Sequence, residues 1–204
     1  MKNNSTQLAA KALALKLNNY THKEGVEYEK MTMGVELILI NVSKLFIIYL
    51  LAMFLGVVPL TLVVQGAYVA IKRYSFGLHA LNSTVCTLVS CFIFVIVPWF
   101  LGHVSFNNLT VISIFVPIVI CLYLYSPADT KARPLIGEMI RRKLKTKAVA
   151  CGIMLMVIAL LVPNETVKFL LTLGAVYQTV SILPFTYKIL KRSEKNYEKF
   201  EQHA

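Results

Sequence analysis

The sequence predicts an all-α fold: a polytopic integral membrane helix bundle with about six transmembrane spans and both termini on the cytoplasmic side. Mean hydropathy is +0.65, 57% of the residues are hydrophobic and only 15% are charged. Asp, Glu, Lys and Arg are missing from long stretches of the chain, namely 45–71, 74–128, 148–164 and 169–187. Because a membrane helix needs roughly 20 apolar residues, stretches of this length exclude a soluble globular domain.

The distribution of basic residues predicts the topology. The net charge is +11, and cytoplasmic loops of membrane proteins carry an excess of Lys and Arg. The most basic segment is 126–147, which we expect on the cytoplasmic side together with 72–76 and both termini. The loops 102–108 and 162–166 lack Lys and Arg and are expected outside. This arrangement requires two crossings within 35–71, and it explains the positive charge without a nucleic-acid partner.

Three regions are expected along the chain. Residues 1–34 form a cytoplasmic or interfacial helical arm, in which the run 7–20, rich in Ala, Leu and Lys, predicts a helix. This helix lies at the membrane surface in our interpretation, and a solvated arm is the alternative. Residues 35–187 form the transmembrane domain, and 188–204 form a basic cytoplasmic tail.

The transmembrane domain divides at its polar and Gly/Pro-containing breaks. The stretch 35–71 is too long for one upright helix, and Gly56 and Pro59 in its middle predict two short helices that meet at a tight turn. The other spans are expected at 78–101, 109–125, 148–161 and 167–187.

Polar residues cluster at the cytoplasmic start of the third span, where burial in hydrocarbon is costly and calls for a reason. One face of the expected helix carries His79, Asn82, Ser83, Cys86 and Ser90. A thiol and an imidazole on one surface are the minimum for a cysteine nucleophile and its base, although such residues also occur where they only pack. Seven residues at about 1.5 Å each separate the Cα atoms of His79 and Cys86 by roughly 10.5 Å. Direct contact requires side chains that lean together or a helix that begins or kinks between them, and Gly77 favours an irregular start.

A second polar segment, 125–135, is bounded by prolines and follows the fourth span. One interpretation is a helix stop combined with an orientation signal. The other is that its cations lie beside His79 and Cys86 and bind an acidic or carboxylate-bearing substrate segment. Charge alone does not decide between the two.

These motifs resemble the accessory gene regulator B (AgrB) family of membrane-embedded cysteine peptidases of Gram-positive bacteria. The resemblance is carried by Arg73, by Gly77-Leu78-His79-Ala80 and by Cys86, with His and Cys seven residues apart after a basic pair. Residues 126–134 resemble the family's loop containing Pro, Thr-Lys and Pro, and the likeness in length, hydropathy and basic tail covers nearly the whole chain. One departure is Phe76, where many members carry a second Gly.

The resemblance implies a cysteine-type endopeptidase that processes a small precursor peptide into a cyclic quorum-sensing signal. Cys86 would be the nucleophile and His79 its general base and acid. Removal of the acidic C-terminal tail would leave a thioester acyl-enzyme, which an internal cysteine of the peptide attacks to close a thiolactone ring. From position and chemistry, Ser83 is a candidate bridging or oxyanion donor, Asn82 is a weaker candidate, and Asp129 is a candidate for orienting His79. The contacts to the acidic substrate segment would come from Arg73, Lys131 and Arg133.

The implied partners are the precursor peptide, with its internal Cys and acidic tail, and membrane lipids. No cofactor, metal ion or nucleic acid is expected, since the four cysteines show no CxxC spacing and no nearby His completes a zinc set. The oligomeric state is left open, with a homodimer as one alternative. The implied location is the cell membrane of a Gram-positive bacterium, with the active site facing the cytoplasm.

Two interpretations from other classes remain. A non-enzymatic membrane transporter or scaffold would use the polar face of 79–90 as a path, although no Asp or Glu lies mid-span to couple to ions. An integral-membrane acyltransferase would share the Cys86 nucleophile and differ in substrate. Mass spectrometry of the products formed from a candidate peptide separates the three.

Overall fold

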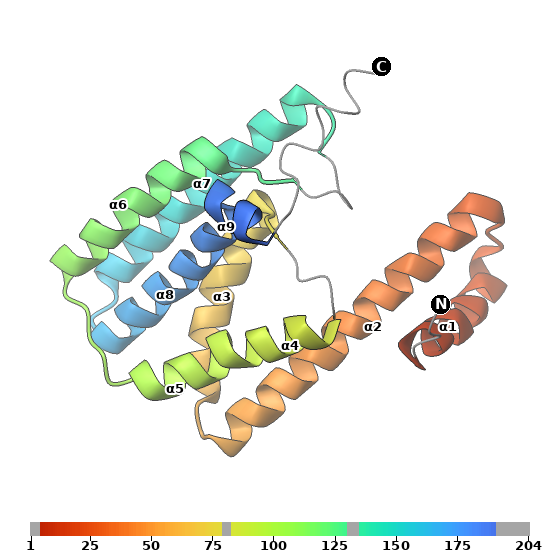
Figure 1. Ribbon diagram of the computed structural model, residues 1–204, viewed down its shortest axis with the longest axis horizontal. Helices are drawn as coiled ribbons and strands as arrows, with labels where there is room; N and C mark the ends of the chain where they lie inside the picture. Colours follow the sequence, from red (N-terminus) through yellow and green to blue (C-terminus); the bar gives the residue numbers. More distant parts are fainter. Residues whose placement is uncertain (1–4, 79–82, 130–134, 191–204) are drawn as a thin grey trace.

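The computed structural model describes residues 5–78, 83–129 and 135–190, and within these ranges the regular structure is helical (Figure 1). The helices are α1 (Ser5–Thr21), α2 (Gly25–Phe54), α3 (Val58–Ser75), α4 (Ser83–Cys91), the π-helix η1 (Phe92–Ile96), α5 (Val97–Leu101), α6 (Asn108–Tyr125), α7 (Glu138–Leu161), α8 (Glu165–Ile182) and α9 (Pro184–Ile189). The predicted all-α class is confirmed for these residues.

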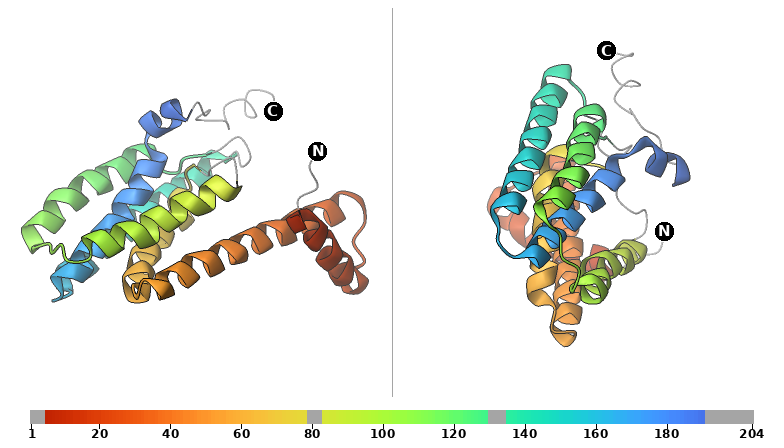
Figure 2. Two further views of the ribbon diagram at one scale, coloured as in Figure 1. Left: turned by 60° about the horizontal axis from the view of Figure 1, so that its bottom comes forward. Right: turned by 90° about the vertical axis from the view of Figure 1, so that its left-hand side faces the viewer.

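The helices form a bundle with one arm. α3, α6, α7 and α8 pack together, and the continuous helix from α4 through η1 to α5 lies across α2 and α3 (Figure 1). α1 folds back along the first part of α2, and this pair extends away from the bundle (Figure 2). The predicted helix at 7–20 is confirmed, and it packs through the buried side chains of Ala10 and Ala14. Its location at a membrane surface stays a prediction.

The chain turns sharply between α2 and α3, as predicted. Gly56 adopts φ 68°, a left-handed conformation that glycine tolerates, and Pro59 lies in the first turn of α3, where its missing N–H needs no partner. α2 is not short, however. It runs for 30 residues from Gly25, because no proline interrupts it and Glu27 in its first turn complements the helix dipole.

The helix expected at 78–101 is described from Ser83 onward, and residues 76–78 before it are bonded to other segments. Further along, the α-helix widens into η1 just before Pro98. A proline lacks the backbone N–H donor, and its ring clashes with the carbonyl of the preceding turn. One wider π turn accommodates the missing hydrogen bond and the ring.

Two boundaries near the C-terminal half are corrected. α7 begins at Glu138, so the second part of the basic segment 126–147 is helical and not a loop. α8 ends at Ile182 and not at 187, because Pro184 cannot continue the helix and starts α9 instead.

Four described helical segments are long and apolar enough to cross a membrane: α2, Thr84–Leu101, α6 and α7. α3 and α8, the other two expected crossings, fall short of this criterion. In α8, Lys168 and Gln178 are buried by neighbouring helices, and Lys168 Nζ donates to Asn108 Oδ1 at 2.6 Å. Packing inside a bundle shields such polar groups from lipid. The six-span count and the cytoplasmic termini stay predictions.

Two apolar clusters hold the bundle together. One joins α3, α6, α7 and α8 around Phe115, and the other joins α2, α3, η1 and α8 around Phe94. α3 and α8 belong to both clusters and approach closely at Gly174, where a Cβ would lie 2.4 Å from the Val64 carbonyl oxygen. Small residues permit this kind of backbone approach between membrane helices. The α3–α8 pair is therefore the centre of the fold.

Candidate active site

Cys86, the predicted nucleophile, lies near the start of α4 and is half-buried. Its Sγ atom accepts a hydrogen bond from Lys44 Nζ on α2 at 2.8 Å. Lys44 was not among the residues predicted from the sequence. The signal that identifies it is its isolation, because it is the only charged residue in 37–71 and an ionisable group in an apolar helix needs a partner.

A second lysine approaches Cys86 from α3. Lys72 and Tyr68 lie within electrostatic range of Cys86, and Lys72 lies within range of Lys44 as well. Lys72 Nζ donates to Tyr68 Oη and lies 4.7 Å from the centroid of that ring. The Tyr68 ring packs edge-on against Phe94 of η1, with centroids 5.0 Å apart. Three segments that are distant in sequence therefore place cationic and aromatic groups around one thiol.

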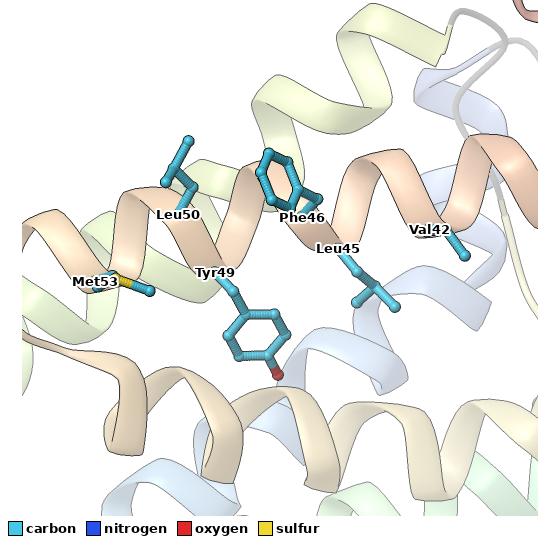
Figure 3. Close-up of a pocket in the computed structure, with 6 residues that line it drawn as sticks. All are labelled: Val42, Leu45, Phe46, Tyr49, Leu50 and Met53. Atoms are coloured by element: carbon cyan, nitrogen blue, oxygen red, sulfur yellow. The ribbon is translucent and has the colours of Figure 1, made fainter.

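The position of Lys44 depends on how α2 is held against α3. Tyr49, little more than one turn after Lys44, points toward α3 (Figure 3), and its hydroxyl donates to Gln65 Oε1 at 2.7 Å. The same part of α2 borders an open groove of about 380 Å³, whose lining is Val42, Leu45, Phe46, Tyr49, Leu50 and Met53. Apart from the Tyr49 hydroxyl this lining is apolar. The hydrogen bond from Tyr49 to Gln65 attaches this part of α2 to α3 beside the site.

The backbone that leads to His79 is held against the segment after α6. The Gly77 N–H donates to the Ala128 carbonyl at 3.0 Å, and the Ala128 N–H donates to the Ser75 carbonyl at 2.9 Å. Gly77 has φ 105°, and a Cβ there would lie 2.7 Å from Ser181 Oγ, so this position requires glycine. The irregular start expected near Gly77 is confirmed.

Phe76 directly precedes Gly77 and has an unusual backbone conformation for a residue with a side chain. Its φ of 56° and ψ of −124° lie in a region that favours glycine. Gln178, fully buried in α8, compensates by donating from Nε2 to the Phe76 carbonyl at 2.6 Å and to Ser75 Oγ at 2.7 Å. The backbone path that a glycine would take easily is thus retained with a phenylalanine.

Asp129 lies in the segment that folds back toward the end of α3. It is buried, and its carbonyl oxygen accepts a hydrogen bond from the Tyr187 hydroxyl of α9 at 2.9 Å. The loop after α6 is therefore fixed by both Ser75 and Tyr187. Orientation of His79 by Asp129 stays a prediction, since His79 lies outside the described residues.

The other predicted site residues are only partly placed. Ser83 is the first residue of α4, and Arg73 is exposed in the last turn of α3, with its guanidinium 5.9 Å from the Tyr74 ring centroid. Four of them lie outside the described residues, namely His79, Asn82, Lys131 and Arg133. All four cysteines are free thiols, of which Cys151 is buried.

The described arrangement suits thiol chemistry. Cys86 lies in the N-terminal half of α4, toward the positive end of the helix dipole, and Lys44 and Lys72 add two ammonium groups. Electropositive surroundings favour the thiolate, which is the nucleophilic form of cysteine.

Comparison with known proteins identifies the family. The family model described as "Accessory gene regulator B" matches residues 8–182. The chain is 40% identical over 201 residues to an AgrB-like protein of Clostridium acetobutylicum, covering 98% of this chain and 96% of that protein. It is 44% identical over 174 residues to an AgrB-like protein of Listeria innocua, covering 85% of each.

A more distant relative carries the family's own name. The chain is 30% identical over 174 residues to "Accessory gene regulator protein B" of Staphylococcus intermedius, covering 84% of this chain and 90% of that protein. No solved structure matches the chain. The resemblance noted in the sequence is confirmed, and the chain belongs to the accessory gene regulator B family.

Proposed function

We propose that this chain is a membrane-embedded cysteine endopeptidase that removes the acidic C-terminal tail of a small precursor peptide and promotes its closure into a thiolactone, an autoinducing quorum-sensing peptide. Family membership implies an accessory gene regulator role in quorum sensing. The observation that best supports the chemistry is the half-buried Cys86 thiol at the start of α4, with the Lys44 ammonium 2.8 Å away.

In the first step the Cys86 thiolate attacks the carbonyl carbon at the end of the retained peptide segment. A C–S bond forms and the C–N bond breaks, and His79 returns the thiol proton to the departing amine. The product is a thioester between the peptide and Cys86. Ser83 and, less directly, Asn82 supply hydrogen bonds to the oxyanion.

In the second step His79 takes the proton of the peptide's internal cysteine, and the resulting thiolate attacks this thioester. One thioester replaces another, so ring closure is nearly isoenergetic, needs no nucleotide, and releases Cys86 as the thiolate. Water must be excluded, because it would hydrolyse the acyl-enzyme, and a membrane-embedded site provides this exclusion.

Cationic residues near the site bind the acidic tail. Arg73 is exposed at the end of α3, and Lys131 and Arg133 follow Asp129, the residue anchored by Tyr187. Because opposite charges attract, these side chains draw the acidic tail toward the cleavage site.

The proposal includes the setting of the enzyme. The protein lies in the cell membrane of a Gram-positive bacterium with the active site facing the cytoplasm, and its partners are the precursor peptide and lipids. The arm 1–34, the peptidase domain 35–187 and the basic tail 188–204 divide the chain. The mechanism uses the residues of one chain and does not require a homodimer.

Mass spectrometry of reaction products tests the proposal. The purified protein in liposomes is incubated with the peptide encoded by a neighbouring reading frame, chosen for its internal Cys and acidic tail. We expect a free tail and a core peptide that is lighter by one water than its hydrolysed form. Uncleaved peptide accumulated inside the liposomes would instead support a transporter, and transfer of an acyl group from another donor would support an acyltransferase.

A further inference from the structure

Lys44 lies on α2 and Cys86 on α4, so their contact depends on how the two helices pack and not on the local sequence. A thiol sulfur is a weak hydrogen-bond acceptor, whereas a thiolate next to an ammonium group forms a charge-assisted pair. The Lys44 Nζ and Cys86 Sγ atoms are in direct contact, 2.8 Å apart, and an ammonium group in direct contact with a sulfur stabilises the thiolate over the neutral thiol.

The other titratable groups that face Cys86 do not replace Lys44. α3 contributes Lys72 and Tyr68, and Lys72 is directed at the Tyr68 hydroxyl. Cys91 lies later on the same helix. Within the described ranges, neither lysine is paired with a carboxylate. Lys44 is thus the described cation in direct contact with the sulfur.

We propose that Lys44 is a catalytic residue whose ammonium group is the counter-ion that keeps Cys86 in the thiolate form. The S–H bond breaks and its proton passes to His79, while Lys44 remains protonated. Desolvation in the bundle strengthens the attraction between the two charges, and the Tyr49–Gln65 bond holds α2 where the pair can form. The inference rests on the proposed function for its role in peptide cleavage, but thiolate formation can be measured without any peptide.

The competing explanation is that Lys44 only extends along α2 toward the membrane surface, as lysines near helix ends do. In that case its removal changes insertion or packing and leaves the ionisation of Cys86 untouched. The pH dependence of Cys86 reactivity separates the two explanations.

The test uses protein whose other cysteines, Cys91, Cys121 and Cys151, are replaced by Ala. The rate of Cys86 alkylation by iodoacetamide is measured in detergent across a pH series. For Lys44→Met we expect the half-maximal pH to rise. Each tenfold loss of thiolate slows alkylation at neutral pH only about threefold, because a more basic thiolate is more nucleophilic. For the same reason the plateau at high pH is equal or higher.

Three further variants make the result specific. Lys44→Arg keeps the charge and should keep the wild-type half-maximal pH. Lys44→Gln repeats the loss of charge with a polar side chain, in case the Met variant fails to fold. Lys30→Met removes an exposed lysine from the same helix and should change nothing.

An unchanged half-maximal pH in folded Lys44→Met or Lys44→Gln overturns the inference. Alkylation that is slowed equally at every pH also overturns it, because such a change reports altered access of iodoacetamide to Cys86. Where the precursor is cleaved, Lys44→Met should lower kcat more than it raises KM. A wild-type protein that shows the Lys44-dependent pH profile but cleaves no peptide contradicts the proposed function while supporting the counter-ion role.

Discussion

Cys86 differs from the other three cysteines in its surroundings. Only Cys86 receives the Lys44 ammonium, while Cys151 is buried in α7. We expect Cys86→Ala to abolish cleavage and any acyl-enzyme, and single replacement of Cys91, Cys121 or Cys151 by Ala to preserve activity. His79→Ala should lower the rate by about 10²–10⁴-fold through loss of base catalysis. Cleavage by purified variants, with a search for hydroxylamine-sensitive adducts, measures this. An adduct on another cysteine contradicts the assignment.

Gly77 is the backbone position on which the approach to His79 depends. Gly77→Ala places a methyl group 2.7 Å from Ser181 Oγ at a φ of 105°, so we expect a loss of about 1–3 kcal/mol in stability together with reduced cleavage. Thermal unfolding in detergent measures the stability. Gly66→Ala is the control, because this helical position in α3 has open space around it and alanine should be neutral or stabilising there. Equal melting temperatures for both variants would be inconsistent with a strained Gly77.

At the scale of helices, the closest packing is between α3 and α8. Gly174→Ala would bring a methyl group 2.4 Å from the Val64 carbonyl oxygen and 2.8 Å from Ala67 Cβ, which forces the helices apart. Overpacking of this kind costs about 1–3 kcal/mol, and we expect a lower melting temperature. Gly34→Ala in α2 meets no atom within 4 Å and serves as the matched control. A Gly174→Ala protein as stable as the control would mean that the contact is looser than described.

The basic segment after α6 is expected to attract the acidic tail of the substrate. Reversing the charges of Lys131 and Arg133 to Glu should weaken processing, and the wild-type rate should fall as salt rises, because salt screens exposed charges. Reversal of Lys11 and Lys16, which are exposed on α1, is the control for net charge. Peptide cleavage at several salt concentrations measures both effects. If neither salt nor charge reversal changes the rate of peptide cleavage, this segment acts only as a topology signal.

For the whole molecule, the open prediction is six spans with both termini cytoplasmic. Single cysteines are placed in a cysteine-free protein at Ser105 and Pro163, since the neighbouring Asn107 and Asn164 cap α6 and α8 and are best left in place. We expect an impermeant thiol reagent to label both positions in intact cells and to leave a cysteine at Glu201 unlabelled. Shielded loops together with a labelled C-terminal position would contradict the model.

The sequence by itself determined the helical class, the turn between α2 and α3, and the candidate nucleophile. These features depend on local properties: charge-free stretches long enough to span a bilayer, a Gly/Pro break, and a thiol in a polar cluster. Local properties also indicated an irregular backbone before His79, because Gly77 permits conformations closed to other residues.

Only the tertiary structure decided how the backbone before His79 is bonded and which cation reaches the thiol. Backbone bonds join residues 76–78 to Ala128 and α8, and hydropathy does not report such pairings. Lys44 and Cys86 are 42 positions apart, and they meet because α2 and α4 pack together. A contact between helices depends on how their faces are oriented in the bundle, and the spacing of residues along one segment carries no information about that orientation.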